Sequence, residues 1–141
     1  MGTSHSTPPS YALIVEGNVL LRLDIATILE DAGFRVLDVA TAYEASEILR
    51  QHGREFALLF TALKLGEERD GTTLAHTTAS NYPHISIMVA SGSDKPEPGE
   101  LPATALFIAK PFSAKIIYQH LKQIMPNDWM PAPLNATKDQ S

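Results

Sequence analysis

Short apolar runs of strand length alternate with longer amphipathic stretches along most of the chain. The runs occupy residues 11–15, 35–40, 56–61, 85–90 and 106–109. Runs this short and this continuously apolar are typical of strands in a sheet that is covered on both faces. Strands that alternate with helices predict an α/β fold, in which parallel strands are joined by right-handed crossovers.

The stretches between the runs carry helical spacing and helix-start residues. Apolar positions recur on one helical face between Asn18 and Ala32, and Gly33 follows as a stop signal. Thr41 and Glu44 have the spacing of a capping box at the start of the next helix. Two further helices are predicted at 72–81 and 113–125.

One connection breaks this alternation. A helix is expected between the fourth and fifth runs, but residues 91–104 contain Pro96, Pro98 and Pro102. Each proline removes a backbone donor and fixes φ. We therefore predict an irregular connection there.

The two ends of the chain differ from the middle in composition. Residues 1–10 are small and polar with prolines, and we interpret them as a flexible leader. Residues 126–141 are rich in proline and end in polar residues, which predicts a flexible tail. The folded domain is expected at 11–125. The sequence leaves open whether Trp129 in the tail is a docking anchor.

Composition narrows the function classes. The net charge of −5 argues against a nucleic-acid footprint, which requires a basic face. The absence of cysteine excludes disulfides, thiolate metal sites and cysteine nucleophiles. No apolar stretch is long enough to span a membrane, and no signal peptide is recognisable. A cytoplasmic location is the simplest expectation.

Ligands of parallel open sheets bind at the carboxyl ends of the strands, so the residues that follow each strand are the candidate site. These residues are Glu16-Gly17-Asn18, Thr61-Ala62, Ala90-Ser91-Gly92 and Lys110-Pro111-Phe112.

This layout resembles the receiver domain of response regulators in bacterial two-component signalling, the CheY-like domains. The resemblance rests on the VEGN and DAGFRV segments, on Asp70-Gly71, on the SG after the fourth strand and on the KPF after the fifth. It implies a flavodoxin-like, doubly wound sheet of five parallel strands in the order 2-1-3-4-5, here with a degraded fourth helix.

The departures from the receiver pattern fall on its phosphorylation site. The resemblance places Glu16 and Gly17 where receivers have two acidic metal ligands, and Ala62 where they have the phosphoacceptor aspartate. Ala90 takes the place of the hydroxyl residue that ends the fourth strand, although Ser91 follows. Lys110 and the cis-favouring Pro111 persist.

These departures predict a degenerate pseudo-receiver. Aspartyl phosphorylation requires a carboxylate nucleophile, and Ala62 has none. Mg²⁺ prefers oxygen ligands from one or two carboxylates, so binding of this cofactor is expected to be lost. Lys110 should instead pair with Glu16.

Several residues have more than one interpretation. Thr61 and Ser91 are possible alternative acceptors, but a threonine in an apolar strand usually reflects β-propensity, and a serine beside glycine usually forms a turn. Phe107 lies at the aromatic switch position of receivers or is simply packed. Residues 67–69 are interpreted as a solvated loop.

The leading hypothesis is a non-enzymatic, phosphorylation-independent module that docks onto a sensor kinase, a regulator or a second copy of itself as a homodimer. Two alternatives stay open at this point. One is a phosphotransfer protein with a non-standard acceptor, and the other is a small-ligand sensor that uses the crevice at the strand ends. The sequence does not identify the partner.

Overall fold

Five parallel strands form one sheet in the order β2-β1-β3-β4-β5. The computed structural model describes residues 9–66 and 68–136. Within these ranges the strands are β1 (Tyr11–Val15), β2 (Arg35–Val39), β3 (Phe56–Ala62), β4 (Ser86–Ser91) and β5 (Ala105–Ala109). The predicted strand order is therefore confirmed, and β3 lies at the centre with every residue buried.

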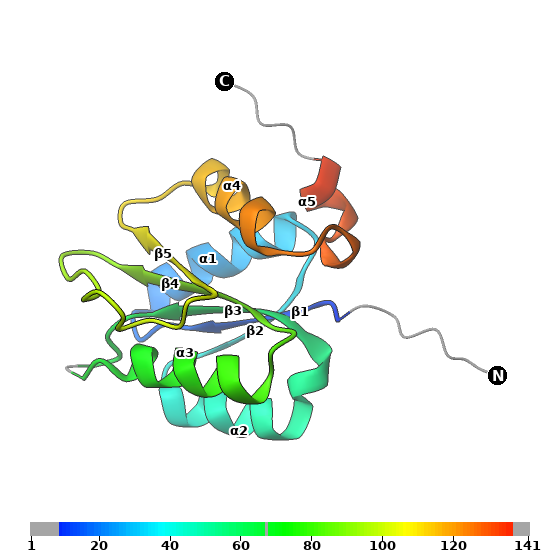
Figure 1. The fold of residues 1–141 in the computed structure, drawn as a ribbon. Coiled ribbons are helices and arrows are strands. Elements are labelled where there is room, and N and C mark those ends of the chain that lie inside the picture. The colour runs from blue at the N-terminus through cyan, green and yellow to red at the C-terminus, as the bar shows by residue number, and fades with distance from the viewer. Residues whose placement is uncertain (1–8, 67, 137–141) are drawn as a thin grey trace.

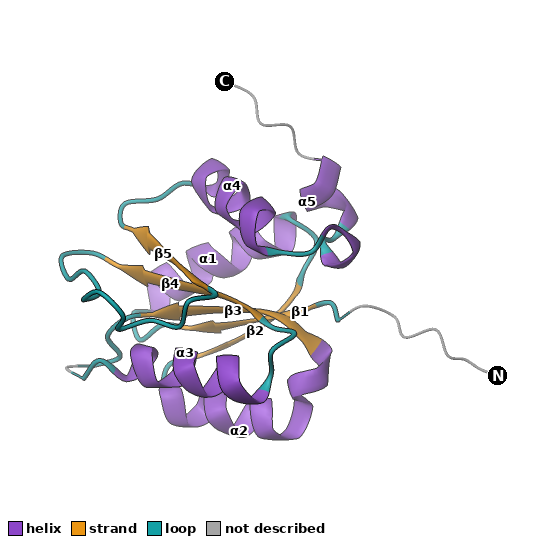
Figure 2. Ribbon diagram, viewed as in Figure 1, coloured by secondary structure: helices purple, strands orange, loops and turns teal. Residues whose placement is uncertain are grey.

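Helices cover both faces of the sheet (Figures 1 and 2). On one face lie α1 (Val19–Asp31), α4 (Ala114–Ile124) and the short α5 (Ala132–Ala136). On the other face lie α2 (Ala42–His52) and α3 (Asp70–Asn81). The buried apolar residues accordingly form two clusters, one on each side of the sheet.

The predicted helix caps form. The Asn18 side chain accepts a hydrogen bond from the backbone N–H of Leu21 at 3.0 Å. Thr41 caps α2 as predicted, because its hydroxyl accepts from the Glu44 N–H. The Glu44 carboxylate reaches back as in a capping box, but it accepts from the N–H of Ala40, one residue before the cap. Each cap satisfies backbone groups that the first helical turn leaves without partners.

Several strand ends differ from the prediction by one residue: β2 ends at Val39 rather than Ala40, and β5 begins at Ala105 rather than Leu106. β3 continues to Ala62, and β4 runs from Ser86 to Ser91 rather than from Ile85 to Ala90. Ladder pairing sets these ends, since Ala62 pairs with Ala90 and Ser91 pairs with Ala109. The residue that ends the fourth strand is therefore a serine.

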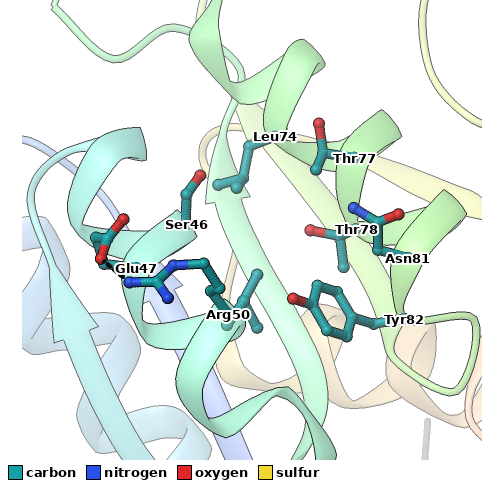
Figure 3. Close-up of a pocket in the computed structure, with 9 residues that line it drawn as sticks. Ser46, Glu47, Arg50, Leu74, Thr77, Thr78, Asn81 and Tyr82 are labelled. Atoms are coloured by element: carbon teal, nitrogen blue, oxygen red, sulfur yellow. Dashed lines mark hydrogen bonds and ion pairs between the residues drawn. The ribbon is translucent and has the colours of Figure 1, made fainter.

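A hollow of about 220 Å³ lies between α2 and α3 (Figure 3). Leu49, Leu74 and Tyr82 supply its apolar lining. The hydroxyl of Thr78 is buried here and has no hydrogen-bond partner among the described residues. The ion pair between Glu47 and Arg50 lies at its rim. The hollow brings together no further charged groups, and it lies on the helical face of the molecule rather than at the strand ends.

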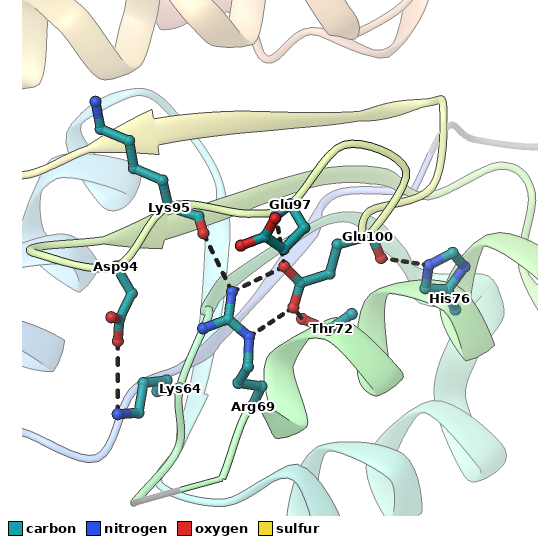
Figure 4. Close-up of polar contacts among 8 residues, drawn as sticks. All are labelled: Lys64, Arg69, Thr72, His76, Asp94, Lys95, Glu97 and Glu100. Carbon is teal, nitrogen blue, oxygen red and sulfur yellow. Dashed lines mark hydrogen bonds and ion pairs between the residues drawn. The ribbon is translucent and has the colours of Figure 1, made fainter.

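The connection between β4 and β5 contains no helix or strand, as the three prolines predict. It is nevertheless held firmly (Figure 4). The Arg69 guanidinium donates to both carboxylate oxygens of Glu100, at 2.6 and 2.8 Å. The same carboxylate accepts from the Thr72 hydroxyl and from the backbone N–H of Glu97. These contacts substitute for the intrahelical bonds that a helix would have provided.

The prediction of a solvated loop at 67–69 is thus wrong for Arg69, and Glu67 lies outside the described residues. The hydrogen bond from Arg69, followed by that from the Glu97 N–H, lowers the pKa of the Glu100 carboxyl from 4.5 to about 2. A bidentate arginine–carboxylate pair is the strong form of such a contact, because two parallel hydrogen bonds fix its geometry.

The segment that follows α4 is folded onto the domain, which corrects the prediction of a flexible tail over 126–141. A short 3-10 turn at Asn127–Trp129 leads into α5, where Leu134 is fully buried. The Leu134 N–H donates to the Ala32 carbonyl at the end of α1. Trp129 packs edge-on against His84, with ring centroids 5.9 Å apart. Apolar burial of Leu134 and Trp129 explains why this segment folds despite its prolines.

Residues 1–8 and 137–141, parts of the predicted leader and tail, lie outside the described residues. The segment that packs onto the end of α1 and the amino edge of the sheet, residues 126–136, is called the C-terminal strap below.

Candidate functional site

A cleft of about 330 Å³ opens at the carboxyl edge of the sheet. It brings together residues from the ends of four parallel segments, as expected for this class of sheet. Its lining consists of Glu16, Ala62, Lys64, Gly66, Ala90, Ser91, Gly92, Ser93, Asp94 and Lys110. The sequence-predicted positions 16, 62, 90, 91 and 110 therefore do converge.

Glu16 and Lys110 form an ion pair across the cleft. The Lys110 Nζ lies 3.9 Å from the Glu16 Oε1, and the glutamate side chain is only 10% exposed. The second carboxylate oxygen, Oε2, accepts the backbone N–H of Asn18 at 2.9 Å. The Glu16 carbonyl accepts from the Arg22 guanidinium, which also pairs with Asp38. Glu16 is therefore fixed at the start of α1 and partly neutralised.

Ala62 presents a methyl group at the end of the central strand. It is 6% exposed and packs with the buried cluster beneath α2 and α3. Its neighbour Thr61 is fully buried, and the Thr61 hydroxyl donates to the Ala62 carbonyl at 3.0 Å. A hydroxyl that is buried and already bonded has no access to an incoming group from the cleft.

Ala90 and Ser91 both line the cleft, and β4 runs one residue beyond Ala90. Ala90 is 2% exposed and belongs to the core cluster under α1 and α4. Ser91 ends the strand, and its carbonyl accepts the Lys110 N–H at 2.8 Å. The cleft therefore retains one hydroxyl residue at this strand end. The sequence pattern alone does not separate the two positions, because they are neighbours in the chain.

The remaining predicted positions lie beside the cleft. Gly17 is exposed, and a β-carbon there would have its nearest neighbour 4.0 Å away, at the Ala40 carbonyl. The Lys110–Pro111 peptide bond is cis. Phe107 is half-buried in β5 and belongs to neither apolar cluster of buried residues.

Sequence reasoning missed a second lysine in the cleft. Lys64 follows β3 by two residues, and its Nζ lies 3.5 Å from the Asp94 carboxylate on the irregular connection (Figure 4). Both side chains are about two-fifths exposed. The position of Lys64, two residues after the central strand, could have predicted this, because a residue there lies at the carboxyl edge of the sheet.

We compared the chain with known proteins in sequence and in structure. No protein-family model matches the chain. The chain is 30% identical over 117 residues to the transcriptional regulatory protein PhoP of Escherichia coli K12, covering 80% of this chain and 51% of PhoP. It is 29% identical over 116 residues to the sensor kinase CckA of Brucella abortus, covering 80% of this chain and 12% of CckA.

Solved structures give the same answer for the fold. A response regulator receiver protein from Sinorhizobium medicae superimposes with a TM-score of 0.76 at 24% identity, over 93% of this chain and 98% of that one. The receiver domain of the hybrid histidine kinase CckA gives 0.68 at 22% identity, over 82% and 99%.

The chain has the fold of receiver domains. The resemblance in sequence and the strand order agree with this assignment. The chain spans about half the length of PhoP and about an eighth of CckA. Among residues 9–66 and 68–136, no helix is both long enough and apolar enough to cross a membrane.

Proposed function

We propose that this receiver-type domain is a phosphorylation-independent interaction module of bacterial two-component signalling. The observation that carries the proposal is Ala62, whose methyl group occupies the end of the central strand inside the cleft. A methyl group has no lone pair, so it cannot attack a phosphodonor.

The residues around Ala62 fit Mg²⁺ poorly. Gly17 has no side chain, and Glu16 already faces the Asn18 N–H with one oxygen and Lys110 with the other. The other carboxylate of the cleft, Asp94, is paired with Lys64. A divalent cation would therefore have to compete with an ammonium for either carboxylate, whereas Mg²⁺ needs near-octahedral oxygen ligands. We therefore derive no step through a metal ion.

The first turns of α1 offer a surface for a protein partner. Val19, Leu20 and Leu23 are 52%, 76% and 55% exposed on this helix, directly after the cleft residues 16–18. Large apolar side chains exposed together mark interaction sites more often than isolated ones do. A sensor kinase, a transcriptional regulator or a second copy of the chain is the partner that this proposal implies, in keeping with the relatives CckA and PhoP.

Intact-mass measurement after incubation with acetyl phosphate and Mg²⁺ tests the proposal. The expected result is an unmodified mass, because the nucleophile is missing. A phosphoryl adduct on any residue would contradict the proposal, and peptide mapping would then identify the acceptor. An active receiver domain treated in the same tube is the positive control.

A further inference from the structure

Thr78 has a buried hydroxyl that makes no hydrogen bond. Its side chain is fully buried in α3, and no group among the described residues partners the hydroxyl. A threonine inside a helix can donate to the carbonyl four residues earlier, as Thr27 does to the Leu23 carbonyl in α1 at 3.1 Å. The Thr78 hydroxyl instead points from α3 toward α2 (Figure 3). A buried polar group without a partner is costly, so this hydroxyl marks a position where a further molecule is expected.

The hollow between α2 and α3, which this hydroxyl lines, has preformed walls. Leu49 of α2 and Leu74 of α3 are each 3% exposed and form its apolar sides. Tyr82 also lines the hollow, and its ring is held against Gly53, where a β-carbon would fall 2.5 Å from a ring carbon. Binding sites for small molecules are mostly concave, apolar and preformed, with a few polar groups that fix the orientation of the ligand. The hollow has this composition, with Thr78 as its buried polar group.

The volume and the charge of the hollow limit the ligand. An apolar cavity of about 150 Å³ can take up benzene, so a hollow of about 220 Å³ admits one aromatic ring with a substituent. The charged residues of the lining, Glu47 and Arg50, pair with each other, so the hollow favours a neutral ligand. The Tyr82 ring favours an aromatic ligand, because aromatic pairs gain more than their buried area. A hydroxyl substituent both donates and accepts, and it therefore suits Thr78 whichever role the threonine hydroxyl takes.

We propose that the hollow between α2 and α3 is a binding site for a small neutral aromatic molecule of the phenol class. The ring lies between Leu49, Leu74 and Tyr82, and the hydroxyl forms a hydrogen bond with Thr78. Of the residues that the structure describes, none lines both this hollow and the cleft at the strand ends. The inference therefore goes beyond the proposed function, and either can fail without the other.

The test is a titration of the full chain with phenol, followed by amide NMR shifts. The expected result is a saturable shift at Leu74, Thr78 and Tyr82, while the amide of Lys110 in the cleft does not move. Sodium benzoate, a charged relative of similar size, should bind at least about tenfold more weakly, because its charge would be buried without a counter-charge. If phenol gives no saturable shift at these residues, as expected when water alone occupies the hollow, the proposal is overturned. Benzoate binding as tight as that of phenol would contradict the neutral ligand class.

Thr78→Val tests the contact with the hydroxyl. Valine keeps the branched shape without the hydroxyl, so phenol should bind about fivefold more weakly, the effect of losing one neutral hydrogen bond. Toluene has nearly the shape of phenol without its hydroxyl and should bind the wild type and Thr78→Val with the same affinity. Thr27→Val makes the same change on α1 and should leave the affinity for phenol unchanged. An equal effect on phenol and toluene, or no effect on phenol, would contradict the contact and overturn the proposal.

An aromatic side chain at the rim tests the position of the site. Ser46 is exposed on α2 and lines the hollow, so the ring of Ser46→Phe should occupy the entrance and weaken phenol binding at least about tenfold. Gln51→Phe places the same ring at an exposed position of α2 outside the lining and should change the affinity less than about twofold. Full affinity for phenol in Ser46→Phe, or equal weakening in both variants, would place the ligand elsewhere and overturn the proposal.

Discussion

Gly71 lies directly against the carbonyl oxygen of Ala62. A β-carbon at position 71 would fall 1.8 Å from that oxygen and 2.8 Å from the carbonyl oxygen of Leu63. The Gly71 N–H donates to the same Leu63 carbonyl at 3.1 Å. The start of α3 is therefore seated on the end of the central strand, and the absence of a side chain at position 71 is what allows this contact.

Gly71→Ala should destabilise the domain by at least about 2 kcal/mol, because the methyl group meets backbone atoms that cannot rotate away. Urea unfolding followed by circular dichroism measures the change. Gly17→Ala is the control and should stay within about 0.5 kcal/mol, since its nearest neighbour would be 4.0 Å away. Equal stability of the two variants would show that the contact at position 71 relaxes freely.

Restoring the acceptor alone should not restore phosphorylation. Ala62→Asp places a carboxylate beside Lys110, but the second acidic ligand is still missing at Gly17. Gly17→Asp has room for its side chain and, combined with Ala62→Asp, should raise Mg²⁺ affinity at least about tenfold over the wild type. Calorimetry measures the affinity, and acetyl phosphate labelling follows it.

The control for this series is the Gly17→Asn, Ala62→Asn double variant, which reproduces the shape without the charge. Because Ser91 already ends β4, a third substitution at Ala90 is not expected to be required. If Ala62→Asp alone is labelled as fast as the double aspartate variant, the missing acid at position 17 is irrelevant to the lost activity.

Acid should release the irregular connection between β4 and β5. The pKa of the Glu100 carboxyl is lowered from 4.5 to about 2, so its ionised form is favoured by folding. A lowered pKa stabilises the folded state fully above the unfolded value, and this stabilisation is lost as the pH falls from about 4.5 towards 2.

Glu100→Gln should accordingly destabilise the domain at pH 7, and its difference from the wild type should shrink as the pH falls below 4.5. Thermal unfolding across this range measures the difference. Glu97→Gln is the matched control, because Glu97 contacts Glu100 through its backbone N–H and not through its carboxylate. A constant difference between Glu100→Gln and the wild type down to pH 2.5 would contradict the lowered pKa.

The C-terminal strap should contribute to stability through Leu134. Leu134→Ala is expected to cost about 2–5 kcal/mol, because the side chain is fully buried. Leu20→Ala makes the same chemical change at a residue that is 76% exposed and should cost less than about 0.5 kcal/mol. Chemical denaturation of both variants decides whether the strap is part of the cooperative unit.

Docking at α1 should depend on its exposed leucines. Leu20→Lys combined with Leu23→Lys should reduce cross-linking to the native partner at least about tenfold, since charges replace apolar contact area. Tyr43→Lys removes an equally exposed side chain, 75% against 76% for Leu20, from α2 on the other face. It should leave cross-linking unchanged, and an equal loss in both variants would assign the docking surface elsewhere.

The sequence predicted those features that depend on local pattern. Strand runs, the Asn18 and Thr41 caps, and the proline-rich connection were confirmed because each is decided within a few residues. The strand order followed from the receiver resemblance. The convergence of Glu16, Ala62 and Lys110 followed from the rule that parallel strands end at one edge.

What the sequence did not predict depends on partners that are distant along the chain. Arg69 and Glu100 are 31 residues apart, and nothing local distinguishes such a pair from two solvated charges. Leu134 is buried in a contact with the end of α1, where its N–H donates to the Ala32 carbonyl, about 100 residues earlier in the chain. β4 extends to Ser91 because Ser91 pairs with Ala109 of β5. This pairing is not visible in the sequence, so the predicted strand ended one residue too early.

Helix α1 connects the two ends of the molecule. Its first residues follow Glu16 and the Asn18 cap at the cleft, and the Ala32 carbonyl at its other end accepts the N–H of Leu134. Thirteen helical residues span about 20 Å. A group attached to the strap would therefore be held at a fixed distance and orientation relative to the cleft. Helix α1 would act as the rigid spacer between them. Such an attachment would report a tilt of α1 as a displacement of the attached group.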